Sequence, residues 1–281
     1  MQIGDNVRVR TSGRRARIIE DHGHARYRIL FYAEPAVDAL DGATIEDEDD
    51  AGGIYDAQDL DVIPGLQPEL SAESQRVGHL TRWLALAGVV GPVIYVADFT
   101  IVGLLRPDYS AVSQAVSELG VGPDGWQLNL ALIALGVLLP AFAVGFFQSL
   151  TVWSGKTRRW VSSGLLMLPG VGFAMAGIFP LPNTLHWLLG ASLVFIGSIP
   201  AFFVTGFLLR RNLEWRALGT YAVVTGWLTL LLVIALFGVA NPSSPAASVP
   251  VVGLVERALF VEMLAWYAVA GWRIFGTRTP A

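Results

Sequence analysis

Six long apolar segments follow one another in the last 200 residues of the chain, separated by short polar connections. Each is about 20 residues long or longer, which is what a helix needs to cross roughly 30 Å of hydrocarbon. Backbone polar groups cannot stay unpaired in lipid, so segments of this kind form helices. The pattern predicts six spans, at about residues 82–105, 126–150, 160–179, 185–209, 217–239 and 251–275.

Basic residues gather on one side of these six predicted spans. By the positive-inside rule that side is cytoplasmic, which places both termini in the cytoplasm. Only Arg106 and Arg257 fall on the other side. The ten residues on the cytoplasmic side are Arg76, Arg82, Lys156, Arg158, Arg159, Arg210, Arg211, Arg216, Arg273 and Arg278.

The first 64 residues have a different pattern, in which apolar and polar residues alternate over short stretches bounded by glycine. This pattern predicts four or five strands of a small antiparallel barrel. The stretches "GDNVRVR" and "RARIIED" resemble SH3-like barrels of the KOW or Tudor type. The predicted organisation is an all-β cytoplasmic domain at residues 1–64, a linker at 65–81, an all-α transmembrane domain at 82–275 and a cytoplasmic tail at 276–281.

The charge of the N-terminal region limits its partners. Residues 1–75 hold 16 of the 23 acidic residues but only 7 of the 19 basic ones, a balance that weakens binding to phosphate backbones. We therefore do not expect a nucleic acid partner. The acidic run Glu46–Asp50 is either a solvated loop or a docking loop for a basic protein, so we expect residues 1–64 to contact a cytoplasmic protein.

The polar stretch between the first two spans predicts a further element. In "RPDYSAVSQAVSELG", apolar residues recur with helical spacing along residues 110–119. Asp108 is suited to cap the start of a helix and Gly120 to end it. We expect an amphipathic helix that lies flat on the outer membrane surface as a lid.

The same stretch carries a resemblance to a known family. "PDYSAVSQAVSELG", the following Asn129 and the later "GIFPLPNTLH" resemble a family of six-span prokaryotic membrane proteins catalogued as domain of unknown function 998. The resemblance covers about residues 80–275. It implies the six-span fold and a location in the prokaryotic inner membrane, and it supplies no catalytic residues.

Polar residues near the outer ends of the spans predict a binding site. Ionisable groups within a membrane are expensive and need a reason. We expect these residues to form an outward-facing polar cup that binds membrane lipid or a small amphiphile, while Arg257 pairs with Asp98 or Glu256. The predicted members of the cup are Asp98, Ser113, Ser117, Glu118, Asn129, His186, Glu256 and Arg257.

Two alternative functions stay open at this point. Glu262 falls near the middle of the last span, where it is either a proton relay of a small transporter or a buried, hydrogen-bonded carboxylic acid. Alternatively, His186 is the base of a lipid hydrolase with Ser113 or Ser117 as nucleophile.

Metal and cofactor chemistry is not expected from this sequence. The chain has no cysteine, and its four histidines are too scattered to share a metal. We expect no cofactor, and we favour a protein without enzymatic activity.

Overall fold

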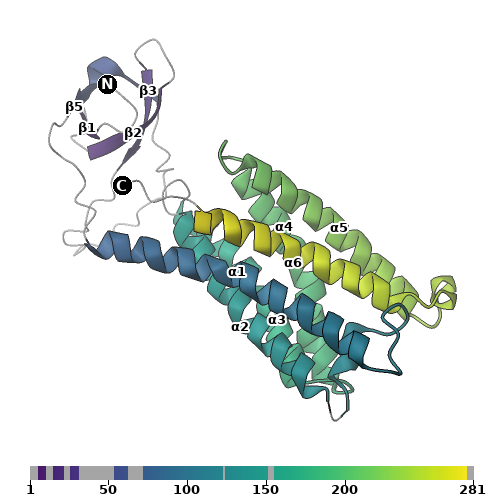
Figure 1. The fold of residues 1–281 in the computed structure, drawn as a ribbon. Helices are drawn as coiled ribbons and strands as arrows, with labels where there is room; N and C mark the ends of the chain where they lie inside the picture. The colour runs from purple at the N-terminus through teal and green to yellow at the C-terminus, as the bar shows by residue number, and fades with distance from the viewer. Residues whose placement is uncertain are drawn as a thin grey trace, which may run out of the picture. The chain divides into compact units, whose positions relative to one another are not determined.

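The computed structural model describes residues 6–10, 15–21, 26–31, 54–62, 72–122, 124–150 and 155–276. The chain divides into two compact units (Figure 1). One comprises Met1–Gln75 with Trp153–Gly155, and the other comprises Arg76–Val152 with Lys156–Ala281.

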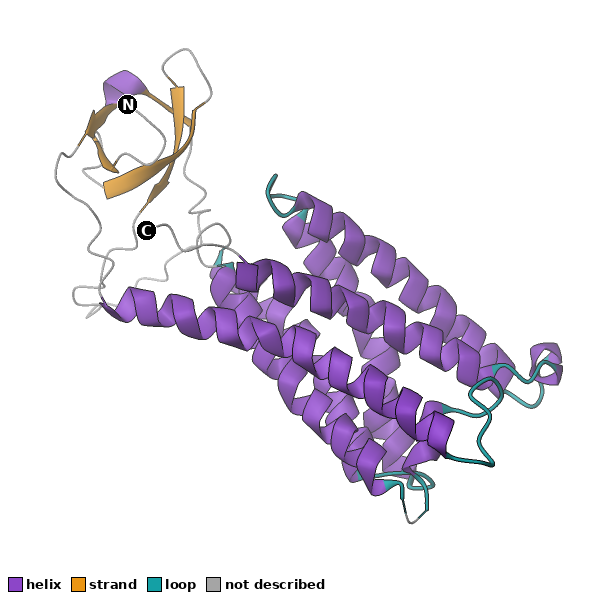
Figure 2. Cartoon of the chain, in the orientation of Figure 1, coloured by secondary structure: helices purple, strands orange, loops and turns teal. Residues whose placement is uncertain are grey.

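Five short strands of the N-terminal unit form one antiparallel sheet in the order β4-β3-β2-β1-β5. Figure 2 shows the strands in orange. In this unit, Arg10 forms a salt bridge with Asp61 at 2.7 Å. The assignment of residues 1–64 to an SH3-like barrel stays a prediction, and the acidic run Glu46–Asp50 lies outside the described residues. The strands are β1 (Asn6–Val9), β2 (Arg15–Asp21), β3 (Arg26–Phe31), β4 (Ile54–Asp56) and β5 (Leu60–Val62), with a 3-10 turn, η1 (Ala57–Asp59), before β5.

The second unit is a bundle of long helices. Helix α1 begins at Ala72, so the helix extends into residues 65–81, which the sequence analysis assigns to a linker. A short π-helix, η3 (His186–Ala191), leads directly into α4. The long helices are α1 (Ala72–Leu105), α2 (Trp126–Ser149), α3 (Lys156–Ile178), α4 (Ser192–Leu209), α5 (Arg216–Ala240) and α6 (Val252–Gly276).

In the described part of the chain, five helical segments are long and apolar enough to cross a membrane. The chain is therefore a multi-pass membrane protein. Helix α6 is not one of the five, and Glu256, Arg257 and Glu262 lie along it. A membrane crossing by α6 stays a prediction. The five segments are Gly78–Leu105, Trp126–Ser149, Lys156–Ile178, His186–Leu209 and Arg216–Ala240.

Aromatic rings fill the centre of the bundle. The ring of Trp266 on α6 packs against Phe142, Phe146 and Phe202, with centroids 5.5 to 6.3 Å apart. Small residues let the helix backbones approach one another. A Cβ at Gly136 of α2 would lie 2.5 Å from the backbone nitrogen of Ala174 on α3. Close packing of this kind holds helices together in lipid.

Residues 110–119 do not form the single amphipathic helix that the sequence predicts. The only helical piece is a short 3-10 helix, η2 (Val116–Gly120). Groups of α6 form hydrogen bonds with backbone atoms of this segment that, in an α-helix, would bond to one another. The backbone N–H of Leu254 donates to the carbonyl of Val112 at 3.0 Å, and the carboxylate of Glu256 accepts from the N–H of Val116 at 2.6 Å. Contacts between distant parts of the chain therefore replace the local helical pattern here.

Candidate ligand-binding pocket

The connection between α1 and α2, residues 106–122, is here called the α1–α2 loop, and Arg257 of α6 holds it in place. Its Nη1 donates to the carbonyls of Ala111 at 2.9 Å and Gly253 at 3.2 Å. Its Nη2 donates to the hydroxyl of Tyr109 at 2.5 Å. Burial raises the pKa of the Tyr109 phenol, and the hydrogen bond from Arg257 opposes that rise. Arg257 thus holds the loop through hydrogen bonds to its backbone and to the phenol of Tyr109.

The predicted ion pair of Arg257 is not formed. In the described residues, no salt bridge joins Arg257 to Asp98 or to Glu256. The guanidinium donors are directed at the loop, and the group also lies 5.6 Å from the centre of the Phe99 ring. Loop carbonyls that have no helical hydrogen bond compete with Asp98 and Glu256 for the Arg257 donors. This competition cannot be seen in the sequence.

Two further members of the predicted cup also support the loop. Asn129 of α2 donates to the carbonyl of Gly120 at 3.0 Å. Glu118 accepts from the backbone N–H of Ala115 at 2.9 Å. These side chains fix the loop conformation, and neither lines the pocket described next.

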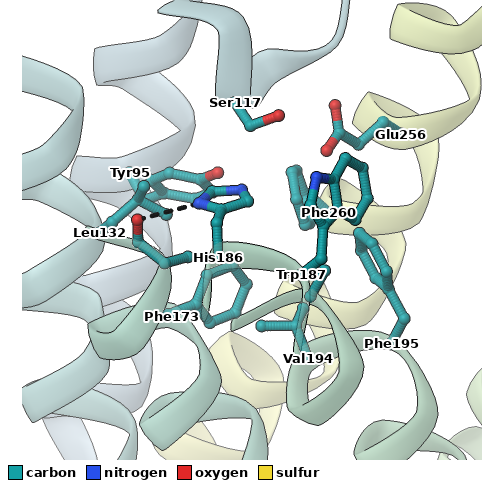
Figure 3. Close-up of a pocket in the computed structure, with 12 residues that line it drawn as sticks. Tyr95, Ser117, Leu132, Phe173, His186, Trp187, Val194, Phe195, Glu256 and Phe260 are labelled. Atoms are coloured by element: carbon teal, nitrogen blue, oxygen red, sulfur yellow. Dashed lines mark hydrogen bonds between the residues drawn. The ribbon is translucent and has the colours of Figure 1, made fainter. Parts of the chain in front are cut away.

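Beneath the loop lies a small, partly open pocket with a cavity volume of about 30 Å³. Its walls come from α1, α2, α3, η3, α4, α6 and the loop itself. Figure 3 shows Ser117 and Glu256 facing into it from the same side, with aromatic rings around the remainder. The lining residues are Tyr95, Ser117, Leu132, Phe173, Ala176, His186, Trp187, Ala191, Val194, Phe195, Glu256 and Phe260.

The position of His186 fixes which of its nitrogens faces the pocket. Its Nδ1 lies 3.1 Å from the carbonyls of both Ala176 and Phe179. A carbonyl only accepts, so Nδ1 carries the hydrogen. In the tautomer that donates from Nδ1, the lone pair is on Nε2, on the side away from these carbonyls. The residue is buried, with 5% of its surface exposed, because it begins η3 at the point where the chain turns from α3 toward α4.

Five polar side-chain atoms of the lining make no hydrogen bond to any other residue that the structure describes. These atoms line the pocket and are not enclosed in the core, so a polar group of a ligand can pair with them. In Figure 3 the indole nitrogen of Trp187 points to the Glu256 side of the pocket. The five atoms are the hydroxyls of Tyr95 and Ser117, Nε2 of His186, Nε1 of Trp187 and Oε1 of Glu256.

The structure thus brings together three of the predicted cup residues, Ser117, His186 and Glu256. Asp98 and Ser113 are not in the lining, and one carboxylate oxygen of Asp98 is buried with no hydrogen-bond partner in the described residues. Sequence reasoning missed Tyr95 and Trp187, since aromatic residues in spans are usually core or interfacial residues.

Glu262 lies apart from the pocket, facing α5. It accepts a hydrogen bond from Thr229 at 3.2 Å. The hydroxyl of Thr225, one turn before Thr229, faces the same carboxylate. Its role as a proton relay stays a prediction.

No group of three or more His, Asp or Glu side chains is placed to hold a metal ion in the part of the chain that the structure describes. Comparison with known proteins identifies a family. The family model described as protein of unknown function (DUF998) matches residues 89–273, which is more than half of the chain. No curated protein and no solved structure matches.

Proposed function

The chain belongs to the DUF998 family, and we propose that it binds a lipid or another small amphiphile in the pocket beneath the α1–α2 loop. The observation that carries this proposal is the set of five unpaired polar atoms around an otherwise apolar pocket. Pockets for small ligands are typically of this kind, mostly apolar with a few converging polar groups.

The two kinds of lining suit the two ends of an amphiphile. The rings of Phe173, Phe195 and Phe260 offer apolar surface to a hydrocarbon chain. Ser117 and Glu256 offer polar contacts to a headgroup near the loop. A pocket within a membrane protein is also reached easily by molecules dissolved in the bilayer, so a lipid-like ligand is the simplest occupant.

Native mass spectrometry of the gently solubilised protein, with identification of the small molecules that remain bound, tests this proposal. We expect one defined amphiphile on the wild-type protein. Ala191→Trp places an indole in the pocket and should remove it. Ser117→Ala should weaken retention, whereas Ser113→Ala, in the same loop but outside the lining, should not. Bulk lipid that all four proteins hold equally would refute the proposal.

A hydrolase is the second candidate, because Ser117 and His186 line the same pocket and His186 has Nε2 free. The Ser117 hydroxyl would attack the carbonyl carbon of a lipid ester while Nε2 takes its proton. The alcohol would leave with that proton, and water would then release the acid from the acyl-serine. Labelling by a fluorophosphonate probe that is lost in Ser117→Ala and kept in Ser113→Ala would support this activity. Absence of labelling would leave only the binding function.

Around this pocket we propose the following architecture. All six helices span a prokaryotic cell membrane, with both termini in the cytoplasm, in agreement with the basic residues on the α2–α3 and α4–α5 connections. The sheet of the N-terminal unit is an SH3-like barrel that binds a cytoplasmic protein partner. The α1–α2 loop and the mouth of the pocket then face outward.

A further inference from the structure

We propose that the polar end of the ligand is a cation, specifically the ammonium group of an amphiphile that is held by Glu256 and the surrounding aromatic rings. This inference rests on the proposed binding function and adds the chemical class of the headgroup. It follows from the charge of the pocket and from the arrangement of its rings.

The pocket contains one acidic side chain and no side chain that is permanently positive. Glu256 is the only acidic side chain in the lining, which includes no lysine and no arginine. It is 6% exposed, and Oε1 has no partner in the described residues. Burying a carboxylate without a positive partner is unfavourable. Arg257 is close enough to act on this carboxyl group electrostatically but directs its donors to the loop, so a ligand cation would be the direct partner of Oε1.

The aromatic rings provide the second part of a cation site. The ring of Phe260 lies at the centre of this group, with centroids 5.6 Å from Tyr95, 5.6 Å from Phe173 and 5.9 Å from Phe195. Ring faces attract ammonium groups within about 6 Å, most strongly where water is excluded. Phe260 follows Glu256 by one helical turn, so carboxylate and ring lie on the same face of α6.

The same features disfavour the anionic headgroups that are common in membranes. Phosphate and sulfate are recognised through arginine, lysine or several backbone N–H groups. Of the side chains that line the pocket, only the indole of Trp187 is purely a donor. Oε1 of Glu256 and Nε2 of His186 are acceptors, which would bind the N–H groups of a primary ammonium.

Equilibrium binding of radiolabelled decyltrimethylammonium to the full-length protein in the neutral detergent dodecyl maltoside tests the inference. The charge of this probe is permanent, so its binding does not depend on the protonation of the ligand. Competitors with the same ten-carbon chain are decylamine, decanol and decyl sulfate. We expect saturable binding of one probe per chain, which decylamine displaces and the neutral and anionic competitors do not.

Variants separate the contribution of charge from that of the fold. Glu256→Gln keeps an acceptor for Val116 and should weaken binding about tenfold or more. Glu262→Gln removes a carboxylate from the same helix outside the pocket and should change nothing. Should Glu256→Gln fail to fold, Phe260→Leu replaces a ring by an aliphatic side chain and should weaken binding about threefold.

The outcomes distinguish this inference from the function on which it rests. Saturable binding in which decanol or decyl sulfate competes as well as decylamine would overturn the cation site and leave amphiphile binding intact. Equal losses in Glu256→Gln and Glu262→Gln would also overturn it. Failure of every ten-carbon compound to bind saturably, together with only bulk lipid in the native mass spectra, would overturn both.

Discussion

The carboxylate of Glu256 on α6 accepts a hydrogen bond from the backbone N–H of Val116 at 2.6 Å, across 140 positions of sequence. The same side chain directs its second oxygen to the pocket. One carboxyl group therefore both positions the α1–α2 loop and lines the pocket. Because one group has both positions, we expect a ligand in the pocket to affect the conformation of the loop.

The first prediction separates these two roles by substituting Glu256. Glu256→Ala leaves the buried N–H of Val116 without its acceptor, which destabilises a protein by about 1–3 kcal/mol. Glu256→Gln retains an acceptor and should lose much less. Thermal unfolding followed by tryptophan fluorescence in one detergent measures the difference. Equal unfolding temperatures for wild type and Glu256→Ala would show that the hydrogen bond does not support the fold.

A second prediction concerns the close contact of the loop with α6. A Cβ at Gly253 would collide with the carbonyl oxygen of Gln114, a backbone atom that cannot move away cheaply. Gly253→Ala should therefore displace the loop and lower the stability. At Gly238 of α5 nothing lies within 4 Å of the added atom. Gly238→Ala should stabilise the helix by up to about 1 kcal/mol.

The two glycine variants are best compared by thermal unfolding and by hydrogen exchange of the α1–α2 loop. We expect faster exchange in Gly253→Ala, because the hydrogen bond from Leu254 to Val112 would be lost with the loop contact. Gly238→Ala serves as the control, since it makes the same chemical change in another helix. Unchanged loop exchange in Gly253→Ala would contradict the described packing.

The positions of the long helices could be predicted closely from the sequence. The expected segments 126–150 and 217–239 correspond to α2 (Trp126–Ser149) and α5 (Arg216–Ala240). Hydrocarbon thickness sets the length of a span, so a local count of apolar residues is sufficient. The 3-10 conformation of the α1–α2 loop could not be predicted in this way. Its backbone partners on α6 are about 140 residues away in the sequence.

The candidate pocket, too, could be predicted from the sequence only in part. Helical rise predicts that His186 and Glu256 share one depth, whereas Ser117 enters the sequence analysis as a candidate nucleophile on the predicted outer helix. Depth does not give the rotation of each helix about its axis. Asp98 was therefore grouped with residues whose pocket it does not line, and Tyr95, one turn earlier on α1, was missed.

A third prediction assigns separate roles to the two nitrogens of His186. The amide nitrogen of asparagine can take the place of Nδ1, so His186→Asn should keep the donor to the carbonyls of Ala176 and Phe179. It removes Nε2, which faces the pocket. We expect near-normal thermal stability and weaker amphiphile retention in native mass spectra.

His186→Ala is the comparison for this variant. It removes both nitrogens and should also lower the stability, by about 1–3 kcal/mol, because the buried carbonyl of Ala176 and the part-buried carbonyl of Phe179 lose their shared donor. Equal stability losses in the asparagine and alanine variants would mean that Nδ1 does not hold the end of α3. Full ligand retention in both would remove Nε2 from the binding site.

The last prediction tests the orientation of the helices in the membrane. The chain has no cysteine, so a single introduced thiol is a unique reporter. Two exposed positions lie at opposite ends of α5. Leu213→Cys is in the connection between α4 and α5, and Ser243→Cys is in the connection between α5 and α6. In intact cells a membrane-impermeant maleimide should label Ser243→Cys and spare Leu213→Cys. The proposed orientation, which follows from the basic residues flanking Leu213, has that connection in the cytoplasm. Permeabilised cells should show both labelled, with the wild-type protein as the blank. The reverse pattern in intact cells would invert the proposed orientation and turn the mouth of the pocket toward the cytoplasm.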